Sequence, residues 1–282
     1  MFSLRIGNQK NEILDFTKDD RYAVIAISGL GPPNAIINTT AIALTDGSRF
    51  NSSRVNERNI VITIRLRYDV ENARLNLYRF FKSKFPCRCY YQNSRRNVFI
   101  DGYVESVEID LFSIQETVQV SIICPDPYFK DLTTTYTSIS KIIPRFEFPF
   151  SIDSHGIEFS TSEREKKTDV INRGDVPTGI IMELKANGRI LQPRIYNSDT
   201  KEMFGLKVDM QLGDLITINT LRGQKSISLL RNGVTTNIMN SIMEKSSWFQ
   251  LSPGDNIFTY TCDVGEEFFD MRIIHNDLYE GV

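Results

Sequence analysis

The sequence contains few of the side chains on which catalysis most often depends. Only two of its 282 residues are histidine, His155 and His275, and neither lies near a nucleophile-elbow motif, because no Gly-x-Ser-x-Gly occurs. The phosphate-binding P-loop motif and the zinc-binding His-Glu-x-x-His motif are also absent. The sequence therefore predicts no catalytic, cofactor-binding or metal-ligating residue and no cofactor. We expect the protein not to be an enzyme.

Cysteine is also scarce, and its spacing does not suit a metal site. The four cysteines are Cys87, Cys89, Cys124 and Cys262, and no Cys-x-x-Cys pair occurs among them. Structural zinc sites usually need such a pair together with a second cluster of ligands. We expect four reduced, mostly buried thiols that act as small hydrophobic side chains, as in a protein that folds in a cytoplasm.

Long apolar runs and an excess of positive charge are both missing. No run approaches the ~20 apolar residues needed to cross a bilayer, and the first residues lack a signal-peptide pattern. Residues 1–135 carry a net charge of +2 and residues 136–282 a net charge of −4. Nucleic-acid-binding domains are typically far more basic. We therefore expect no membrane association and no tight nucleic-acid binding.

Patterns typical of β-strands dominate the first half of the sequence. Residues 97–129 predict two long strands joined by a short break and closed by a Pro-Asp-Pro turn. Within the second strand, Val118, Val120 and Ile122 alternate with polar residues, which is typical of a strand with one buried face. Similar patterns predict strands over residues 22–28, 35–44 and 58–68, and a first hairpin that turns at Gly7-Asn8.

One helix is predicted, over residues 70–84. Its apolar residues fall on a single stripe at positions 70, 73, 77, 80 and 81. Asp69 is placed to cap the start of the helix, and Pro86 prevents its continuation. We expect this helix to cover one face of the sheet.

The segment between two of these strands is polar and has no apolar period. A turn is predicted at Asp46-Gly47, and residues 48–57 that follow it predict an extended loop or arm. Before the segment, the sequence Gly-Leu-Gly-Pro-Pro over residues 29–33 ends the strand 22–28, because proline cannot donate to a ladder.

The second half of the sequence predicts a β-sandwich. Residues 130–143 are rich in Thr and Ser and predict a linker, so we place the domain boundary between residues 135 and 136. Many short strands with turns between them follow, without a convincing helix. Asn187-Gly188 and Asn232-Gly233 are two-residue hairpin signals. The last strand, over residues 270–275, either joins the sandwich or returns to the first domain.

A sandwich also raises the question of sugar binding. Sugar-binding sandwiches usually offer exposed aromatic rings, and the chain has a single tryptophan, Trp248, with Tyr196 and Phe204 on other predicted strands. A lone tryptophan in a sandwich belongs to the core more often than to a binding face. Exposure of Trp248 or Tyr196 on a concave face would favour a carbohydrate-binding module.

The order of these segments resembles the distal tail protein (Dit) family of siphoviruses that infect Gram-positive hosts. Three short segments carry the resemblance in the first half: Arg-Asn-Ile-Val at 58–61, Gly-Tyr-Val-Glu at 102–105 and Cys-Pro-Asp-Pro-Tyr-Phe at 124–129. In the second half the matching segments are residues 172–175, 212–214 and 251–256. Each segment alone is weak evidence, and together they are specific.

The resemblance implies a mainly β protein with two domains. Residues 1–135 would form a tail-tube-like β-sandwich with one helix, and residues 136–282 a galectin-like, jelly-roll β-sandwich. Six copies would form a ring that joins the tail tube protein to the tail-associated hub (lysin) protein and carries receptor-binding or baseplate proteins. The hairpin 35–68 would embrace the next subunit. The protein would lie at the virion tail tip after assembly in the host bacterial cytoplasm.

Two other functions are weighed against this one. The first is a carbohydrate-binding module protein that contacts saccharides of the host cell wall, and the resemblance supplies no sugar-contacting positions for it. The second is a tail-tip hydrolase, which the lack of a catalytic constellation disfavours.

Overall fold

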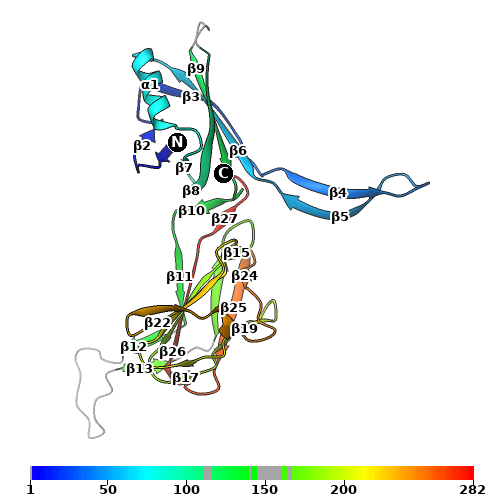
Figure 1. The fold of residues 1–282 in the computed structure, drawn as a ribbon, viewed down its shortest axis with the longest axis vertical. Helices are drawn as coiled ribbons and strands as arrows, with labels where there is room; N and C mark the ends of the chain where they lie inside the picture. Colours follow the sequence, from blue (N-terminus) through cyan, green and yellow to red (C-terminus); the bar gives the residue numbers. More distant parts are fainter. Residues whose placement is uncertain (1, 111–115, 140, 145–159, 164–166) are drawn as a thin grey trace. The chain divides into compact units, whose positions relative to one another are not determined.

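A computed structural model describes residues 2–110, 116–139, 141–144, 160–163 and 167–282. These residues are mainly β and contain a single α-helix, as the sequence predicts (Figure 1). The chain divides into two compact units. Unit 1 comprises Met1–Leu132 together with Leu278–Val282, and unit 2 comprises Thr133–Asp277. No described helix is long and apolar enough to span a membrane.

Unit 1 is built on a nine-stranded sheet, seven strands of which follow the order β2-β1-β7-β8-β9-β6-β3. The two short strands β10 and β27 pair with each other, and β10 also pairs with β8. The strands are β1 (Ser3–Asn8), β2 (Ile13–Asp15), β3 (Tyr22–Ser28), β6 (Arg58–Leu66), β7 (Pro86–Gln92), β8 (Asn97–Asp110), β9 (Thr117–Cys124), β10 (Phe129–Asp131) and β27 (Leu278–Tyr279).

The long strand β8 serves both halves of this sheet. It pairs with β7 up to Tyr103 and with β9 from Tyr103 onward, and its register shifts between Val104 and Ser106. A bulge of this kind bends a strand and increases its twist. Buried side chains from β1, β6, β7, β8 and β9 thereby reach one hydrophobic core, which the helix residues Ala73 and Leu77 complete.

The helix α1 (Val70–Phe80) is shorter than predicted and begins differently. Its stripe is as predicted, with Ala73, Leu77 and the following Phe81 buried. The predicted cap at Asp69 is wrong: this residue has a φ of 47°, and its side chain makes no capping hydrogen bond. Its carboxylate instead accepts hydrogen bonds from Asn72 Nδ2 at 2.9 and 3.0 Å.

The first hairpin also turns later than predicted. Gly7 lies inside β1, and the turn runs from Asn8 to Glu12. The Asn8 side-chain oxygen accepts hydrogen bonds from the backbone N–H groups of Lys10 and Glu12, and Asn11 takes a φ of 61°. An Asx turn of this kind competes with a glycine turn, and the sequence alone does not rank the two.

An arm, defined as residues 35–55, extends from unit 1 (Figure 1). It consists of β4 (Ala35–Ala41) and β5 (Ser48–Val55), which form a two-stranded antiparallel sheet. Residues 48–57 were predicted to be an extended loop or an arm; the structure has an arm here, and its second strand β5 was not predicted as a strand. The first strand ends three residues before the predicted limit of 44, and β6 belongs to the main sheet of unit 1.

Unit 2 is a sandwich of a six-stranded and a four-stranded sheet, with orders β11-β26-β16-β21-β22-β23 and β14-β25-β18-β19. Their buried residues share one core. The strands of the first sheet are β11 (Thr135–Ser138), β16 (Ile181–Ala186), β21 (Leu215–Asn219), β22 (Ser226–Arg231), β23 (Val234–Asn237) and β26 (Phe269–His275). Those of the second are β14 (Lys167–Asn172), β18 (Arg194–Asn197), β19 (Glu202–Gly205) and β25 (Gly254–Thr261).

Short pairs and connections complete unit 2. The pairs are β12 (Lys141–Pro144) with β13 (Ser160–Glu163), β15 (Thr178–Gly179) with β24 (Gln250–Leu251), and β17 (Ile190–Leu191) with β20 (Asp209–Met210). The 3-10 helices are η1 (Met239–Ser241) and η2 (Glu266–Phe268). His155, one of the two histidines, lies outside the described residues.

The linker and one of the two Asn-Gly segments differ from what the sequence predicts. The predicted linker contains β11, an edge strand paired with β26, and the units divide at 132/133 rather than at the predicted 135/136. Asn232-Gly233 forms the predicted hairpin, with both φ angles positive. Asn187-Gly188 does not, because β16 and β17 pair with other strands, and Gly188 instead leaves room for the Phe268 ring.

Candidate functional site

The arm has one face without charge. Directly opposed residues of an antiparallel pair point to the same side of the sheet, so the register assigns each residue to a face. Within that face Ile37 and Phe50 are 57% and 59% exposed. The uncharged face is made of Ala35, Ile37, Thr39 and Ala41 from β4 with Ser48, Phe50, Ser53 and Val55 from β5.

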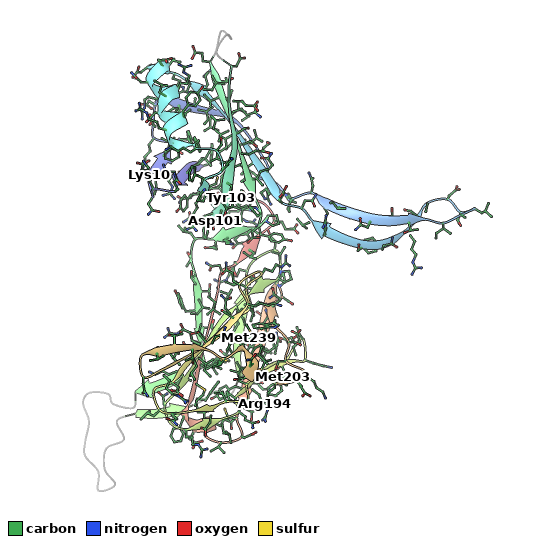
Figure 2. All side chains as sticks on the ribbon, in the orientation of Figure 1. Lys10, Asp101, Tyr103, Arg194, Met203 and Met239 are labelled. Carbon is green, nitrogen blue, oxygen red and sulfur yellow. The ribbon has the colours of Figure 1, made fainter. Side chains whose placement is uncertain are left out.

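The opposite face of the arm is basic and, apart from Ile36, polar. It carries both arginines of the arm, Arg49 and Arg54. Its side chains also bond to each other, from Asn38 Nδ2 to Ser52 Oγ at 3.0 Å and from Asn51 Nδ2 to Thr40 Oγ1 at 2.6 Å. Figure 2 shows the side chains of the arm standing away from its two strands. Since two-stranded ribbons are at best marginally stable in water, the uncharged face is suited to burial against another surface.

The root of the arm is organised by Arg58, the first residue of β6. Its guanidinium donates hydrogen bonds to four backbone carbonyl oxygens: those of Gly29 and Gly31 at 2.5 Å each, and those of Pro127 and Glu280 at 2.6 Å each. The same group lies 4.6 Å from the centre of the Phe129 ring. The side chain is 3% exposed, and this burial lowers the pKa of Arg58 from its ordinary value.

Arg58 brings together segments that carried the resemblance. The Gly-Leu-Gly-Pro-Pro loop supplies two of the four carbonyls, and the Cys-Pro-Asp-Pro-Tyr-Phe segment supplies Pro127 and the Phe129 ring. The glycine of Gly-Tyr-Val-Glu has a different task. A Cβ on Gly102 would lie 2.7 Å from Ile122 Cγ2 and 2.8 Å from Cys124 Sγ, so glycine lets β8 and β9 approach closely.

Sequence reasoning missed the fourth partner of Arg58. Glu280 belongs to the last five residues, which follow the last predicted strand, 270–275, and for which the sequence predicts no partner. That strand, β26, lies in unit 2 between β11 and β16, and the segment that joins unit 1 is β27 with the residues after it. Because any residue offers a backbone carbonyl, no residue type in this segment marks it as an arginine partner.

The segments that carried the resemblance in unit 2 also have structural tasks. Buried Asn172 donates from Nδ2 to the carbonyl oxygens of Val176 and Leu251 at 3.1 and 3.0 Å. Buried Asn256 donates to the Ser252 carbonyl at 2.8 Å. Asp214 accepts from Arg231, which lowers the pKa of this carboxyl. Each of these side chains fixes a turn between strands.

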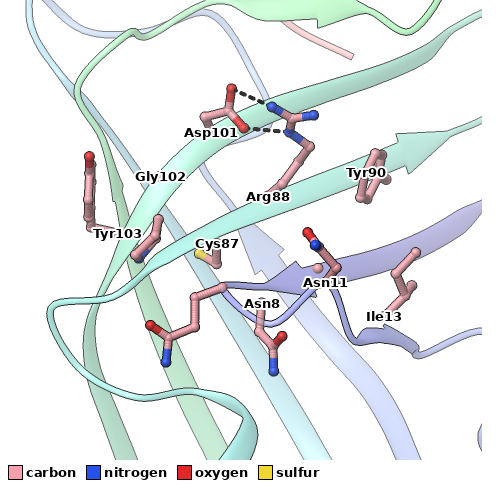
Figure 3. A pocket seen from close by; sticks show the side chains of 12 residues that line it. Asn8, Asn11, Ile13, Cys87, Arg88, Tyr90, Asp101, Gly102 and Tyr103 are labelled. Carbon is pink, nitrogen blue, oxygen red and sulfur yellow. Dashed lines mark hydrogen bonds and ion pairs between the residues drawn. The ribbon is translucent and has the colours of Figure 1, made fainter.

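A groove of about 520 Å³ lies on unit 1 among β1, β7 and β8 (Figure 3). Arg88 and Asp101 face each other across its wall, with Nε and Nη2 of the arginine 2.5 and 3.1 Å from the carboxylate oxygens. Asn8 and Tyr103 line it as well. The two charged side chains of its lining are thus already paired with each other.

The cysteines are placed as structural thiols. Cys87, Cys89 and Cys124 are buried in unit 1, and Cys262 is half-buried in unit 2. Burial raises the pKa of Cys124 and of Cys262 to about 12. Thiols with such values are protonated at neutral pH and are poor nucleophiles. Among the described residues, no group of three or more His, Cys, Asp or Glu side chains could hold a metal ion.

The only tryptophan packs against the core of unit 2. Trp248 is half-buried, and its ring meets the buried Phe204 ring edge-on at 5.2 Å between centroids. The ammonium group of Lys225 lies 5.3 Å from the centre of the indole ring. Tyr196, on β18, is half-buried as well. The Trp248 ring is thus engaged by two neighbours and does not form an open row with other aromatic side chains.

We expect unit 2 to lose stability on mild acidification because of His275. This ring is buried, and Nε2 lies 3.2 Å from the Ile171 carbonyl oxygen and 3.4 Å from Asp277 Oδ1. Burial lowers the pKa of His275 below 6.5, outweighing the attraction of Asp277. The unfolded chain therefore binds a proton at a higher pH than the folded chain, and stability falls as pH drops below about 6.5.

Denaturation of unit 2 at pH 7.5 and 5.5 measures this effect. A His275→Gln variant should lose most of the difference between the two pH values. An equal difference in the variant would assign the pH dependence to other groups.

Two family models match the sequence. The phage tail protein RIFT-related domain matches residues 14–124, and the C-terminal domain of the siphovirus-type tail component (SPP1 Dit) matches residues 173–271. The chain belongs to the distal tail protein family of siphophages. Its arm, its Arg58 centre and its two units are therefore parts of a structural protein of the phage tail, and its place is in the virion.

Solved structures agree with this assignment at the level of the fold. The crystal structure of SPP1 Dit (gp 19.1), described as a paradigm of the hub adsorption apparatus in phages that infect Gram-positive bacteria, has a TM-score of 0.69. It is 13% identical in sequence and the match covers 99% of each chain. A chain of the phage P2 baseplate in its Ca-bound activated conformation has a TM-score of 0.53 at 11% identity, with both chains fully covered. No curated protein sequence matches this chain.

Proposed function

We propose that six copies of this chain form a ring at the distal end of the tail. In that ring, unit 1 joins the tail tube protein to the tail-associated hub protein. Unit 2 is a galectin-like platform that carries receptor-binding or other baseplate proteins. The chain itself catalyses no reaction. Ring formation uses a heterologous interface, in which a donor surface of one subunit meets a different receiving surface of the next until the rotation closes.

The arm is the observation that carries this proposal. Its uncharged face exposes Ile37 and Phe50, while its other face carries Arg49 and Arg54. Burial of the uncharged face removes no charged group from water. Burial of the opposite face would desolvate two arginines. The arm therefore presents one face to a neighbouring subunit and leaves the other in water.

A host saccharide is the alternative ligand of unit 2, and neither Trp248 nor Tyr196 favours it. Both side chains are half-buried, and the indole ring already contacts Phe204 and Lys225. Protein partners are the better match for unit 2.

Light scattering behind a sizing column measures the mass of the purified protein. We expect a species near six times the 32.4 kDa of one chain. If the chain is a monomer by itself, the ring should form when the cognate tube and hub proteins are added. A chain that stays monomeric with both proteins present would overturn the proposal.

Charge placed on one face of the arm should separate assembly from folding. We expect Ile37→Asp combined with Phe50→Asp to abolish the ring, because two carboxylates would have to be buried in the interface. The matched control, Asn38→Asp with Asn51→Asp, adds the same charge to the opposite face and should leave the mass unchanged. Equal loss in both variants would show that net charge, not the uncharged face, governs assembly.

A further inference from the structure

The last five residues of the chain, Leu278–Val282, form a return segment that is bound into unit 1 at several points. β27 pairs with β10, with Phe129 opposite Tyr279. The guanidinium of Arg96 lies 4.2 Å from the centre of the Tyr279 ring, and its Nη1 donates a hydrogen bond to the Gly281 carbonyl. The Tyr279 hydroxyl also donates a hydrogen bond to Asp131 Oδ2 on β10 at 3.4 Å, so the segment is joined to the sheet of unit 1 through a strand pair, Arg96 and this bond.

The same segment reaches the root of the arm. The Val282 N–H donates a hydrogen bond to the Leu30 carbonyl oxygen at 3.1 Å. A Cβ built on Gly281 would lie 3.2 Å from the Leu30 oxygen and from the Gly31 carbonyl carbon, so the two backbones are in close contact here. Through Arg58, the Glu280 carbonyl is tied to the carbonyls of Gly29 and Gly31 as well.

The loop that receives these contacts leads directly into the arm. Residues 29–34 connect β3 to β4, and β5 returns to β6 through residues 56 and 57, next to Arg58. The arm therefore has two attachments to unit 1. One of them, the 29–34 loop, is held on Arg58 and on the return segment.

The return segment is the last part of unit 1 to be synthesised. The return segment follows all of unit 2, since unit 2 comprises Thr133–Asp277. A chain is made from its N-terminal side, and its domains fold in that order. The arm root is complete only after unit 2 has been synthesised.

We infer that the return segment is a latch that sets the direction of the arm. Without it the arm is folded but turns freely at the 29–34 loop. Since ring closure requires a fixed rotation between subunits, a chain without the latch does not assemble. The latch thereby keeps chains with an unfinished unit 2 out of the ring. This second step rests on the proposed function, whereas the first concerns a single chain.

The direction of the arm can be measured by electron–electron double resonance. One spin label is placed on the polar face of the arm by Ser52→Cys and one on β7 by Gln92→Cys. Both changes are made in a Cys262→Ser background, in which the other native thiols are buried. Labelled chains are mixed with an excess of unlabelled chains, so that the distance reported lies within one subunit.

Two variants remove the latch in different degrees. Deletion of residues 280–282 removes its contacts at the arm root. Arg96→Ala removes the hydrogen bond to the Gly281 carbonyl and the contact with the Tyr279 ring, and leaves the pairing of β27 with β10 in place. We expect each to at least double the width of the distance distribution and to eliminate the ring-sized species. The matched control is Arg88→Ala, which removes a similar arginine over the Phe99 ring, at 4.4 Å, and should change neither reading.

An unchanged distance distribution in both variants would overturn the latch. If the deletion unfolds unit 1, as seen by hydrogen exchange of β6 and β9, Arg96→Ala alone decides the outcome. The oligomer mass and the distance distribution also test the two proposals separately. A wild-type chain that never forms a ring contradicts the proposed function, while the distance distribution still tests the latch.

Discussion

Replacement of Arg58 by alanine is expected to destabilise unit 1 by about 3–5 kcal/mol. The change removes four hydrogen bonds from a buried charged donor and leaves the carbonyl oxygens of Gly29, Gly31, Pro127 and Glu280 without this partner. A hydrogen bond that involves a charged group contributes about 1.5–3 kcal/mol, although such contributions do not add fully. Folded domains are stable by about 5–15 kcal/mol, so this loss is a large fraction of the total.

Two further variants distinguish the causes. Arg58→Lys keeps the positive charge, but an ammonium group has three donors at one point and cannot span carbonyls held by a planar fork. We expect it to lose most of the same stability. Arg88→Ala removes an arginine whose ion pair with Asp101 is about half exposed, and exposed pairs contribute only about 0–1 kcal/mol.

Native-state hydrogen exchange of β6 and β9 amides is the suitable measurement, because it reports unit 1 separately from unit 2. Protection in β21 and β22 of unit 2 serves as the internal reference. If Arg58→Ala and Arg88→Ala lowered protection in β6 equally, the buried Arg58 side chain would contribute no more to the stability of unit 1 than the half-exposed Arg88 does.

The strands of both units could largely be predicted because their buried faces repeat every second residue. Residues 22–28 match β3 at both limits, and the alternation of Val118, Val120 and Ile122 corresponds to fully buried side chains. Prediction was incomplete for β5 and β11, two strands that have no buried face. β5 is exposed over almost its whole length, and β11 is an edge strand with Tyr136 63% exposed, so neither shows an apolar period.

Local backbone choices were a second source of error. Asp69 is a favourable capping residue, but its left-handed conformation turns the carboxylate toward Asn72. The helix likewise ends at Phe80, well before the proline that was expected to limit it.

The candidate site was predictable in part only. The residues that meet at the arm root were recognised as segments of a family pattern, yet what they do there depends on contacts between residues 29, 58, 127 and 280. A single sequence does not display contacts over such separations. Once the fold is known, these segments have a common physical explanation, since they build and orient the arm rather than a reaction centre.

A methyl group added at Gly29 is expected to cost at least about 3 kcal/mol, and comparison with Gly47 separates its two causes. Both glycines have positive φ angles, 83° and 90°, which disfavour alanine by about 1 kcal/mol. At Gly47, in the turn of the arm, an added Cβ meets nothing within 4 Å. At Gly29 it would fall on the backbone carbonyl oxygen of Asn59, the residue after Arg58, and backbone cannot move aside cheaply.

Gly47→Ala should therefore leave hydrogen-exchange protection in β6 unchanged and loosen only the arm turn, while Gly29→Ala should lower protection throughout β3 and β6. The clash acts at the point where the 29–34 loop rests on Arg58, so Gly29→Ala should also weaken ring assembly at protein concentrations at which Gly47→Ala assembles normally. If both variants behaved alike, the positive φ angle alone would set the cost of alanine at these two positions. The close approach of β3 and β6 at the arm root would then contribute little to the stability of unit 1.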